Sequence, residues 1–536
     1  MNVEIKTLPL DHHGLVAGVF DQLDIANVID DRIPKLRNHK LSHSTVIKAM
    51  ILNGLGFVGQ RLYLFPEFYE KLPIERLLGE GVAAADLNDD ALGRTLDSIY
   101  AYGPTELFNE ISLKVMSQLD LGVQRLHADT TSFSVQGEYE GPSGQKAIEI
   151  ALGHSKDGRM DLKQFILVLA ANQDGIPLFA KAHSGNASDK NTIIEAMLKI
   201  KAGLSLDDSS YYIADSAVYS EKNIQQLGVG MHWITRPPAT INECEVLLNS
   251  DVEMIECKDT RYRCFSTTSN YGGIPQKWIL YQSQPMQERK EKTFEKKLEK
   301  ENKQAEGSLG KLRRREFACE ADARKEADLW LLEHSFHVFN GLSVKMVKRR
   351  MGKKQGRPRK DEELREVYLI DANIELDYEK VSKIKSKLGR FILATNDVNL
   401  DPDTILSYYK GQQSVERGFR FLKDKCFRVA EVYLKKEERI EALAMIMVLT
   451  LMIYSIAEWT IRKKLRESEK TIPNQLKKPT QKPTFKWIAF LFMGVAEVTV
   501  WINGEMHQKI ANLNDNLVKI IRLFGKGCEK YYGLES

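Results

Sequence analysis

One run of apolar residues constrains the fold more than any other segment. Residues 442–457 form a stretch of 16 in which only Thr450, Tyr454 and Ser455 interrupt the apolar side chains. A helix that spans a bilayer needs ~20 apolar residues, so this run is too short. We therefore expect a helix that is buried in a protein core.

The length and composition set the broad class of protein. With 536 residues the chain exceeds a typical domain several times, so several domains or one heavily inserted domain are expected. The net charge of +4 is too small to require a nucleic-acid partner. The six cysteines include no C-x2-C pair, which excludes a zinc module or disulfide framework and favours reduced thiols in a cytoplasm. The start, with Glu4, lacks the pattern of an ordinary signal peptide.

The two ends of the chain are expected to be helical. Within residues 1–120, one helix should span residues 42–57 with Ser42 and Ser44 as possible caps, and another should follow Asp89 and Asp90 and stop at Gly103. Short helices joined by polar turns suit a helix-turn-helix that reads DNA, and they suit a plain helical bundle equally well. Residues 463–536 are assigned to a C-terminal helical region.

Residues 121–235 change to a strand pattern. Three strands are expected to form an antiparallel meander, followed by a helix and a fourth strand: residues 125–135, 146–155, 163–172, 188–200 and 211–215. This order is that of the first part of an RNase H-like domain, although a sheet-plus-helix pattern is not specific by itself.

The rest of the catalytic domain is expected after an insertion. Residues 236–385 contain short strand-like pieces and a highly charged helical stretch, which indicates an inserted subdomain. Residues 386–462 supply a further strand and a helix that begins near Asp401 and Pro402. The predicted class is α/β: an RNase H-like domain with a mixed sheet, interrupted by a large insertion and flanked by helical N-terminal and C-terminal regions.

A basic segment lies inside this insertion. Nine of the 16 residues from 345 to 360 are Lys or Arg and none is acidic, with Arg357 and Arg359 on either side of a proline. We expect these two arginines to contact DNA phosphates, and the alternative is specific reading of a narrow minor groove.

Three acidic residues lie in informative places. Asp129 is inside the first predicted strand, Asp215 is at the end of the fourth, and Glu416 is on the helix after the insertion. Burial of a lone carboxylate is costly unless a cation or hydrogen bonds compensate it. Three carboxylates in one cleft can hold two Mg²⁺ ions for phosphodiester chemistry, with Mn²⁺ as a substitute. His127, two residues before Asp129, either touches this site or is a satisfied sheet histidine.

The helix around Glu416 carries an unusual polar stripe. Tyr409, Gln412, Glu416, Arg420 and Lys423 are separated by three, four, four and three residues, so they share one helical face. An aromatic ring, an amide, a carboxylate and two cations suit contact with a polyanion and metal better than packing, whereas a solvated charged face is the alternative.

These motifs resemble a bacterial insertion-sequence DDE transposase. Tyr409, Glu416 and Lys423 match the Tyr-x2-Arg-x3-Glu-x6-Lys signature of the insertion-sequence-four family, while Gln412 replaces its arginine. The segments around Asp129 and Asp215 are similar to the first two acidic motifs of the family. The overall pattern looks most like the insertion sequence 1634 subgroup.

This resemblance implies an activity and partners. It implies that Asp129, Asp215 and Glu416 are the catalytic metal ligands, that the protein cuts element ends, and that it transfers the 3′-hydroxyl into target DNA. It also implies a homodimer on paired ends, with residues 1–120 binding the end DNA, in a cytoplasmic protein that joins the nucleoid on DNA. Two rivals stay open: an RNase H-like nuclease without transposition, and a transposase-derived regulator that binds DNA with weak or no catalysis.

Overall fold

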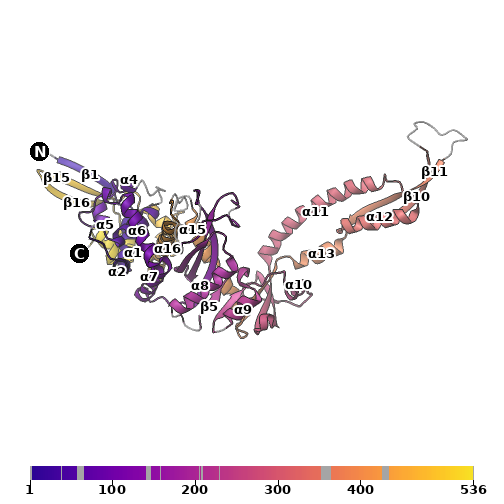
Figure 1. Cartoon of the computed structure of the whole chain (residues 1–536), viewed down its shortest axis with the longest axis horizontal. Helices are drawn as coiled ribbons and strands as arrows, with labels where there is room; N and C mark the ends of the chain where they lie inside the picture. Colours follow the sequence, from indigo (N-terminus) through magenta and orange to yellow (C-terminus); the bar gives the residue numbers. More distant parts are fainter. Residues whose placement is uncertain are drawn as a thin grey trace.

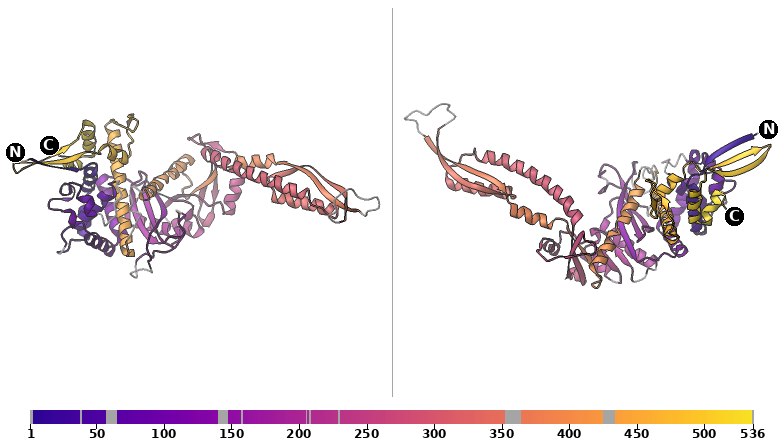
Figure 2. Two further views of the ribbon diagram at one scale, coloured as in Figure 1. Left: turned by 90° about the horizontal axis from the view of Figure 1, so that it is seen from above. Right: turned by 180° about the vertical axis from the view of Figure 1, so that it is seen from behind.

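The protein has an elongated body from which a long arm projects (Figure 1). The computed structural model describes every residue except 1–2, 38, 57–64, 140–146, 157, 205, 207–208, 229, 352–363, 425–433 and 535–536. The arm extends away from the body in all the views of Figures 1 and 2, and the two chain ends lie together at the opposite end of the molecule.

A nine-stranded mixed sheet forms the centre of the body. Its order is β4-β3-β2-β5-β6-β12-β9-β8-β7. The strands are β2 (Arg125–Ser134), β3 (Gln164–Asn172), β4 (Pro177–Ser184), β5 (Tyr211–Ile213), β6 (His232–Thr235), β7 (Ile255–Glu256), β8 (Tyr262–Ser269), β9 (Gln276–Ser283) and β12 (Arg390–Thr395). β2 pairs antiparallel with β3 and parallel with β5, so it is the strand at which the antiparallel meander joins the parallel part. The predicted mixed α/β class is therefore confirmed.

The expected second strand of the meander is wrong. Among the described residues of 146–155 only Ala151 forms a bridge, to Gln164, and the third meander strand is instead β4. Ile148 and Ile150 are buried, so the apolar alternation reflects burial, while backbone pairing is limited to the Ala151 bridge and a hydrogen bond of 2.9 Å from the Gly185 amide to the Glu149 carbonyl. Gly153 lies so close to Gly185 that a side chain at either residue would clash with backbone oxygens, because this segment crosses the sheet end at close range.

The two helices predicted in the N-terminal region are present, although the first ends at Gly54 rather than at residue 57. α3 (His43–Gly54) is capped by Ser42, whose hydroxyl accepts a hydrogen bond of 3.2 Å from the Thr45 amide. α6 (Asp89–Tyr102) ends at Gly103. The other elements of this region are β1 (Val3–Pro9), α1 (His13–Gln22), α2 (Ile25–Arg32), α4 (Phe65–Tyr69), α5 (Ile74–Leu78) and α7 (Pro104–Leu119).

The chain between β6 and β12 both extends the sheet and builds the arm. β7, β8 and β9 continue the central sheet beyond β12. The arm has its own small apolar core, centred on Trp330 and Phe317. Its elements are α11 (Gln284–Leu312), α12 (Glu320–Glu333), the hairpin of β10 (His337–Arg350) and β11 (Leu364–Leu376), and α13 (Tyr378–Lys387). The helices that pack around the sheet are α8 (Asp189–Leu204), α9 (Glu221–Leu227), α10 (Asn242–Asn249), α14 (Pro402–Lys410) and α15 (Gln413–Leu422).

α16 (Glu437–Glu467) contains the long apolar run and lies inside the body. Of the described helices, α16 alone is long and apolar enough to cross a bilayer, yet 83% of its most apolar window is buried in the protein. A helix that is apolar all round needs cover on every side. α16 receives that cover from α1, α3, α6, α7, α15, the C-terminal helices α17 (Phe485–Leu491) and α18 (Asp515–Phe524), and β4. The expectation of a core helix is confirmed.

The two chain ends share one structural unit. β1 pairs antiparallel with β15 (Ala496–Ile502), which also pairs with β16 (Glu505–Ala511). The remaining C-terminal elements are the short strands β13 (Ile472–Pro473) and β14 (Pro479–Thr480) and the helix α19 (Lys526–Glu529).

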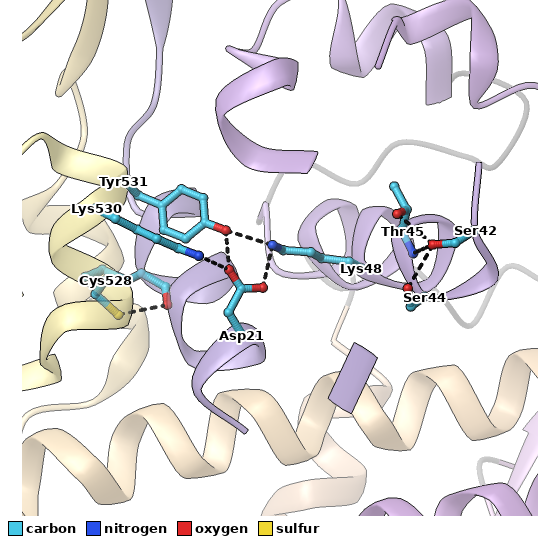
Figure 3. Close-up of polar contacts among 9 residues, drawn as sticks. Asp21, Ser42, Ser44, Thr45, Lys48, Cys528, Lys530 and Tyr531 are labelled. Carbon is cyan, nitrogen blue, oxygen red and sulfur yellow. Dashed lines mark hydrogen bonds and ion pairs between the residues drawn. The ribbon is translucent and has the colours of Figure 1, made fainter. Parts of the chain in front are cut away.

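A charged cluster fixes α1 to the C-terminal segment. Figure 3 shows Asp21 between Lys48 on one side and Lys530 and Tyr531 on the other. The Lys48 and Lys530 ammonium groups each lie 2.7 Å from an Asp21 carboxylate oxygen, and the Tyr531 hydroxyl donates to Asp21. Burial raises the pKa of Asp21, but the charges and hydrogen bonds of its three partners outweigh it, so the net pKa is lowered. The carboxylate therefore stabilises the contact between the two chain ends.

Because of this cluster, we expect Asp→Asn substitutions at two neighbouring aspartates to lower the free energy of unfolding by different amounts. Asp21→Asn should lower the free energy of unfolding by about 2–4 kcal/mol, because Lys48, whose side chain is 11% exposed, would keep its charge without a carboxylate. Asp24→Asn is the matched control: its ion pair with Lys114 is over a third exposed on both sides, so the loss should stay below about 1 kcal/mol. Urea unfolding followed by circular dichroism measures both, and equal losses would contradict the role of the cluster.

Candidate active site

The parallel pairing of β2 with β5 places Asp129 and Asp215 at one sheet edge. His127 pairs with Ile213, and each aspartate lies two residues beyond its member of this pair. Side chains two residues apart on a strand share a face. The two aspartates therefore occupy equivalent positions just beyond the last residues that pair between β2 and β5. Asp215 ends the strand region as a cap: its Oδ1 accepts a hydrogen bond of 2.9 Å from the Ala217 amide, and its carbonyl accepts one of 2.7 Å from Thr235 Oγ1.

The junction of α14 and α15 brings Glu416 to the same edge. Gly411, between the helices, lies against the His127 ring, where a Cβ would meet imidazole atoms at 2.5 Å. Gln412 is buried, and its amide nitrogen donates a hydrogen bond of 3.0 Å to the Ala128 carbonyl. This pair of contacts fixes the start of α15 on β2, and Glu416 is exposed one turn further along the helix. Glycine is the residue that permits this close approach.

The charges of the three acids meet at Asp129. The pKa of Asp129 is raised to about 6, mainly by burial and also by the negative charges of Asp215 and Glu416. Lys156 and a hydrogen bond from the Thr130 amide act in the opposite direction. The structure therefore brings the three predicted acids into one electrostatic site at which a negative charge is unfavourable.

Tyr409 belongs to this site. The pKa of Tyr409 is raised to about 12, mainly by burial. The charges of Asp215, Glu416 and Asp129 also raise this pKa, and the Arg236 guanidinium lowers it. Tyr409 thus lies within the field of all three carboxylates. Arg236, directly after β6, is a basic group at this site that sequence reasoning missed.

Lys156 is a second residue that the sequence did not reveal. Its ammonium lies 3.8 Å from Asp129 Oδ1, and it donates hydrogen bonds of 2.7 Å to the carbonyl and the hydroxyl of Thr130. The segment around Lys156 has the composition of a turn, and no spacing rule connects it with Asp129. Only the fold shows that this loop returns to β2.

The other predicted contact residues have different settings. Arg420 is exposed on α15, while the Lys423 ammonium lies 5.5 Å from the centre of the Phe133 ring on β2. Gln412 was expected to contact DNA, but its side chain donates a hydrogen bond within the protein, to the Ala128 carbonyl. His127 is buried, which lowers its pKa to about 4, so it has the setting of a neutral sheet histidine. Arg357 and Arg359 lie outside the described residues.

The acids fit a divalent cation in their chemistry. Carboxylate oxygens are the ligands that Mg²⁺ prefers, and an added positive charge would offset the repulsion at Asp129. Within the described part of the chain, however, no group of three or more His, Cys, Asp or Glu side chains lies close enough together to hold an ion. The three carboxylates are therefore suitable ligands for a metal ion, but the described side chains are too far apart to coordinate one ion together.

The mixed sheet and its acidic edge define the class of an RNase H-like catalytic domain. Residues 125–453 match the model of the transposase DDE domain, and residues 3–113 match a domain of unknown function, DUF4277. The first match covers more than half of the chain, so the protein belongs to the transposase DDE domain family. No curated protein matches the chain. Enzymes of this family typically use divalent metals and act on DNA.

The raised pKa of Asp129 predicts a gain of stability when its charge is removed. The folded state holds the Asp129 proton more tightly than the unfolded state, whose ordinary pKa is 3.8, so stability falls as the pH rises from about 4 through about 6. Asp129→Asn should therefore raise the free energy of unfolding by about 1–3 kcal/mol at pH 8.

The same substitution should have little effect near pH 4, where the native carboxyl is already protonated. Urea unfolding without added metal at the two pH values measures this difference. Asp328→Asn, at an exposed position on α12, is the matched control and should leave the free energy of unfolding unchanged at both. A loss of stability at pH 8 in Asp129→Asn would contradict the electrostatic description of the site.

Proposed function

We propose that this transposase cuts DNA at the ends of an insertion sequence and transfers the freed 3′-hydroxyl into target DNA. One observation carries the proposal: Asp129 and Asp215, from two parallel strands, and Glu416, from a helix, lie close enough for the charges of Asp215 and Glu416 to raise the pKa of the half-buried Asp129 carboxyl. Its mechanistic detail goes beyond family membership, which identifies a transposase only in general terms.

The proposed cofactor is a pair of Mg²⁺ ions, for which Mn²⁺ could substitute. Its ligands would be Asp129, Asp215 and Glu416. Such ions lower the pKa of the attacking water or 3′-hydroxyl and stabilise the leaving oxygen. The carboxylates act as ligands rather than as proton donors. Lys156 supports Asp129 as a nearby positive charge, which reduces the cost of keeping that carboxylate ionised near neutral pH.

Several other residues of the chain orient DNA in this proposal. Tyr409, Arg420 and Lys423 would contact the end DNA beside the acids, and Gln412 would hold α15 in register with β2. Arg357 and Arg359 would contact phosphates. Residues 1–120 would bind the element ends, and two copies of the chain would pair these ends.

The finer classification is also proposed. The positions of Tyr409, Glu416 and Lys423 favour the insertion-sequence-four family, and the overall pattern favours its insertion sequence 1634 subgroup. We propose a cytoplasmic protein that associates with the nucleoid through DNA. The buried position of α16 is compatible with this location.

Loss of a single carboxylate should separate catalysis from DNA binding. Asp129→Ala and Glu416→Ala should each reduce Mg²⁺-dependent cleavage at least ~10³-fold, because each removes a metal ligand, while binding to end DNA stays within about twofold. A supercoiled plasmid that carries the coding region with its flanking DNA provides the natural ends, and gel electrophoresis measures nicks and breaks. Gln413→Ala, at an exposed neighbour on α15, should retain cleavage.

A second assay distinguishes transposition from simple nuclease activity. Precut ends are mixed with a supercoiled target, and only a transposase joins the two DNA molecules. Cleavage without joining would favour a nuclease, and DNA binding without cleavage would favour a regulator. Full cleavage by either alanine variant would reject the proposed ligands.

A further inference from the structure

A groove lies beside the catalytic helix, on a side of α15 that the proposed metal site does not use. It has a volume of about 580 Å³ and runs between α15, α16, the turn from β3 to β4, and residues 481–484. α15 contributes Ser414, Arg417, Gly418 and Phe421, whose spacing of three, one and three residues defines one helical face. The groove is therefore built by the same helix that carries Glu416.

Positive charge dominates the lining of this groove. The lining contains five cationic and three acidic side chains. The cations are Arg417, Arg420, Arg462, Arg466 and Lys482, and the acids are Asp174, Asp424 and Glu458. Glu458 is already engaged: it pairs with Arg462 at 2.6 Å and accepts a hydrogen bond of 3.0 Å from the Phe485 amide. The groove thus keeps a net positive charge towards a ligand.

Three arginines of the lining make no ion pair or side-chain hydrogen bond with the described part of the chain. Arg417, Arg420 and Arg466 are exposed, and neither an ion pair nor a side-chain hydrogen bond joins them to any other residue that the structure describes. Arg462, by contrast, is held by Glu458 and by the Pro483 carbonyl, to which it donates at 2.8 Å. Unpaired guanidinium groups at a concave surface suit phosphate oxygens, which they can bind in a bidentate way.

Aromatic side chains occupy the same groove. Trp459 is half-buried in its lining, and the Lys463 ammonium lies 4.6 Å from the centre of the Trp459 ring. Tyr454 packs on Phe421 with ring centres 4.3 Å apart. Cations combined with an accessible indole are the features with which proteins bind single-stranded nucleic acid, because phosphates meet the cations and bases stack on the ring.

The groove lies next to Glu416 along α15, and Glu416 itself is outside its lining. Arg417 directly follows Glu416, and Arg420 lies one turn from Glu416 while it also lines the groove. A strand that passes Glu416 would therefore meet Arg420 and Arg417 next. This order connects the site of cutting with the groove.

We infer that this groove binds a single-stranded segment of DNA that leaves the acidic site, with its phosphates on Arg417, Arg420 and Arg466 and a base on Trp459. The inference rests on the proposed DNA cleavage and names the path of one strand. Unpaired DNA is the occupant because the groove offers both a phosphate track and a stacking surface, whereas a duplex keeps its bases stacked inside.

A binding experiment tests the inference without catalysis. The full-length protein, in EDTA, is titrated into a fluorescein-labelled oligodeoxynucleotide of mixed sequence, either single-stranded or annealed as a duplex, and anisotropy reports the Kd. The double variant Arg417→Ala/Arg466→Ala should weaken single-strand binding by about tenfold and lower the salt dependence of log K by about 1.4. Duplex binding should change by less than about twofold.

Matched variants separate charge, stacking and folding. Trp459→Ala should weaken single-strand binding about fivefold or more, and Trp459→Phe should retain most of it. Lys222→Ala, an exposed cation on α9, should leave both affinities unchanged. Thermal unfolding should show wild-type stability for the arginine variant, because both side chains are exposed.

Two results would overturn the inference: unchanged single-strand affinity in the arginine variant, or equal losses for single strand and duplex. The failure of the catalytic proposal is a different result. It would be absence of Mg²⁺-dependent cleavage by the wild type while the variants still lose single-strand binding, and that outcome would leave the groove supported.

Discussion

Burial of α16 is the constraint on which the rest of the structure depends. A helix that is apolar on all sides is stable in water only when other elements enclose it. The enclosing elements come from the N-terminal helices, from the C-terminal helices and from the sheet. α15 also packs on α16, with Gly418 close to Leu451. The position of α15, and with it that of Glu416 beside the sheet, therefore depends on a core that both ends of the chain help to build.

The acidic site differs from this core in the interactions that its residues make. The core gains stability from apolar contacts, whereas the site places Asp215 and Glu416 where each makes ionisation of Asp129 less favourable. Natural proteins retain such unfavourable groups mainly where they serve a function. Burial is the largest cause of the raised pKa of Asp129, and the nearby cation, Lys156, offsets only part of the total rise. The site is thus arranged to attract positive charge, and this property connects the electrostatics of the fold with the proposed chemistry.

Local sequence patterns predicted much of the fold, because caps and periodicity act over a few residues. Ser42 at the start of α3 and Asp401 at the start of α14 are such cases: each side chain accepts a hydrogen bond from the amide three residues on. The approach of the three acids was also predictable, since strand ends and one helix carry them. The ligand roles assigned to Asp129, Asp215 and Glu416 stay a prediction.

The misses concern contacts between residues far apart in the chain. No local rule places Lys156 beside Asp129, joins β1 to β15, or adds β7–β9 to the sheet edge. The residues around Ile148 alternate like a strand, but they form no regular strand: Ala151 makes a single bridge to Gln164, and the Glu149 carbonyl accepts a hydrogen bond of 2.9 Å from the Gly185 amide. The uniform stripe predicted along one helix is also divided between α14 and α15, where Gly411 and Gln412 bring the chain close to β2.

The pairing of β1 with β15 has a consequence for synthesis of the protein. Nearly the whole chain separates Pro9 from its partner Ala496, so the first strand leaves the ribosome long before the strand that completes its sheet. The cluster around Asp21 has the same dependence, because Lys530 and Tyr531 follow β15. A product shortened before β15 would lack these partners. Only chains translated through this region can form the joined end unit.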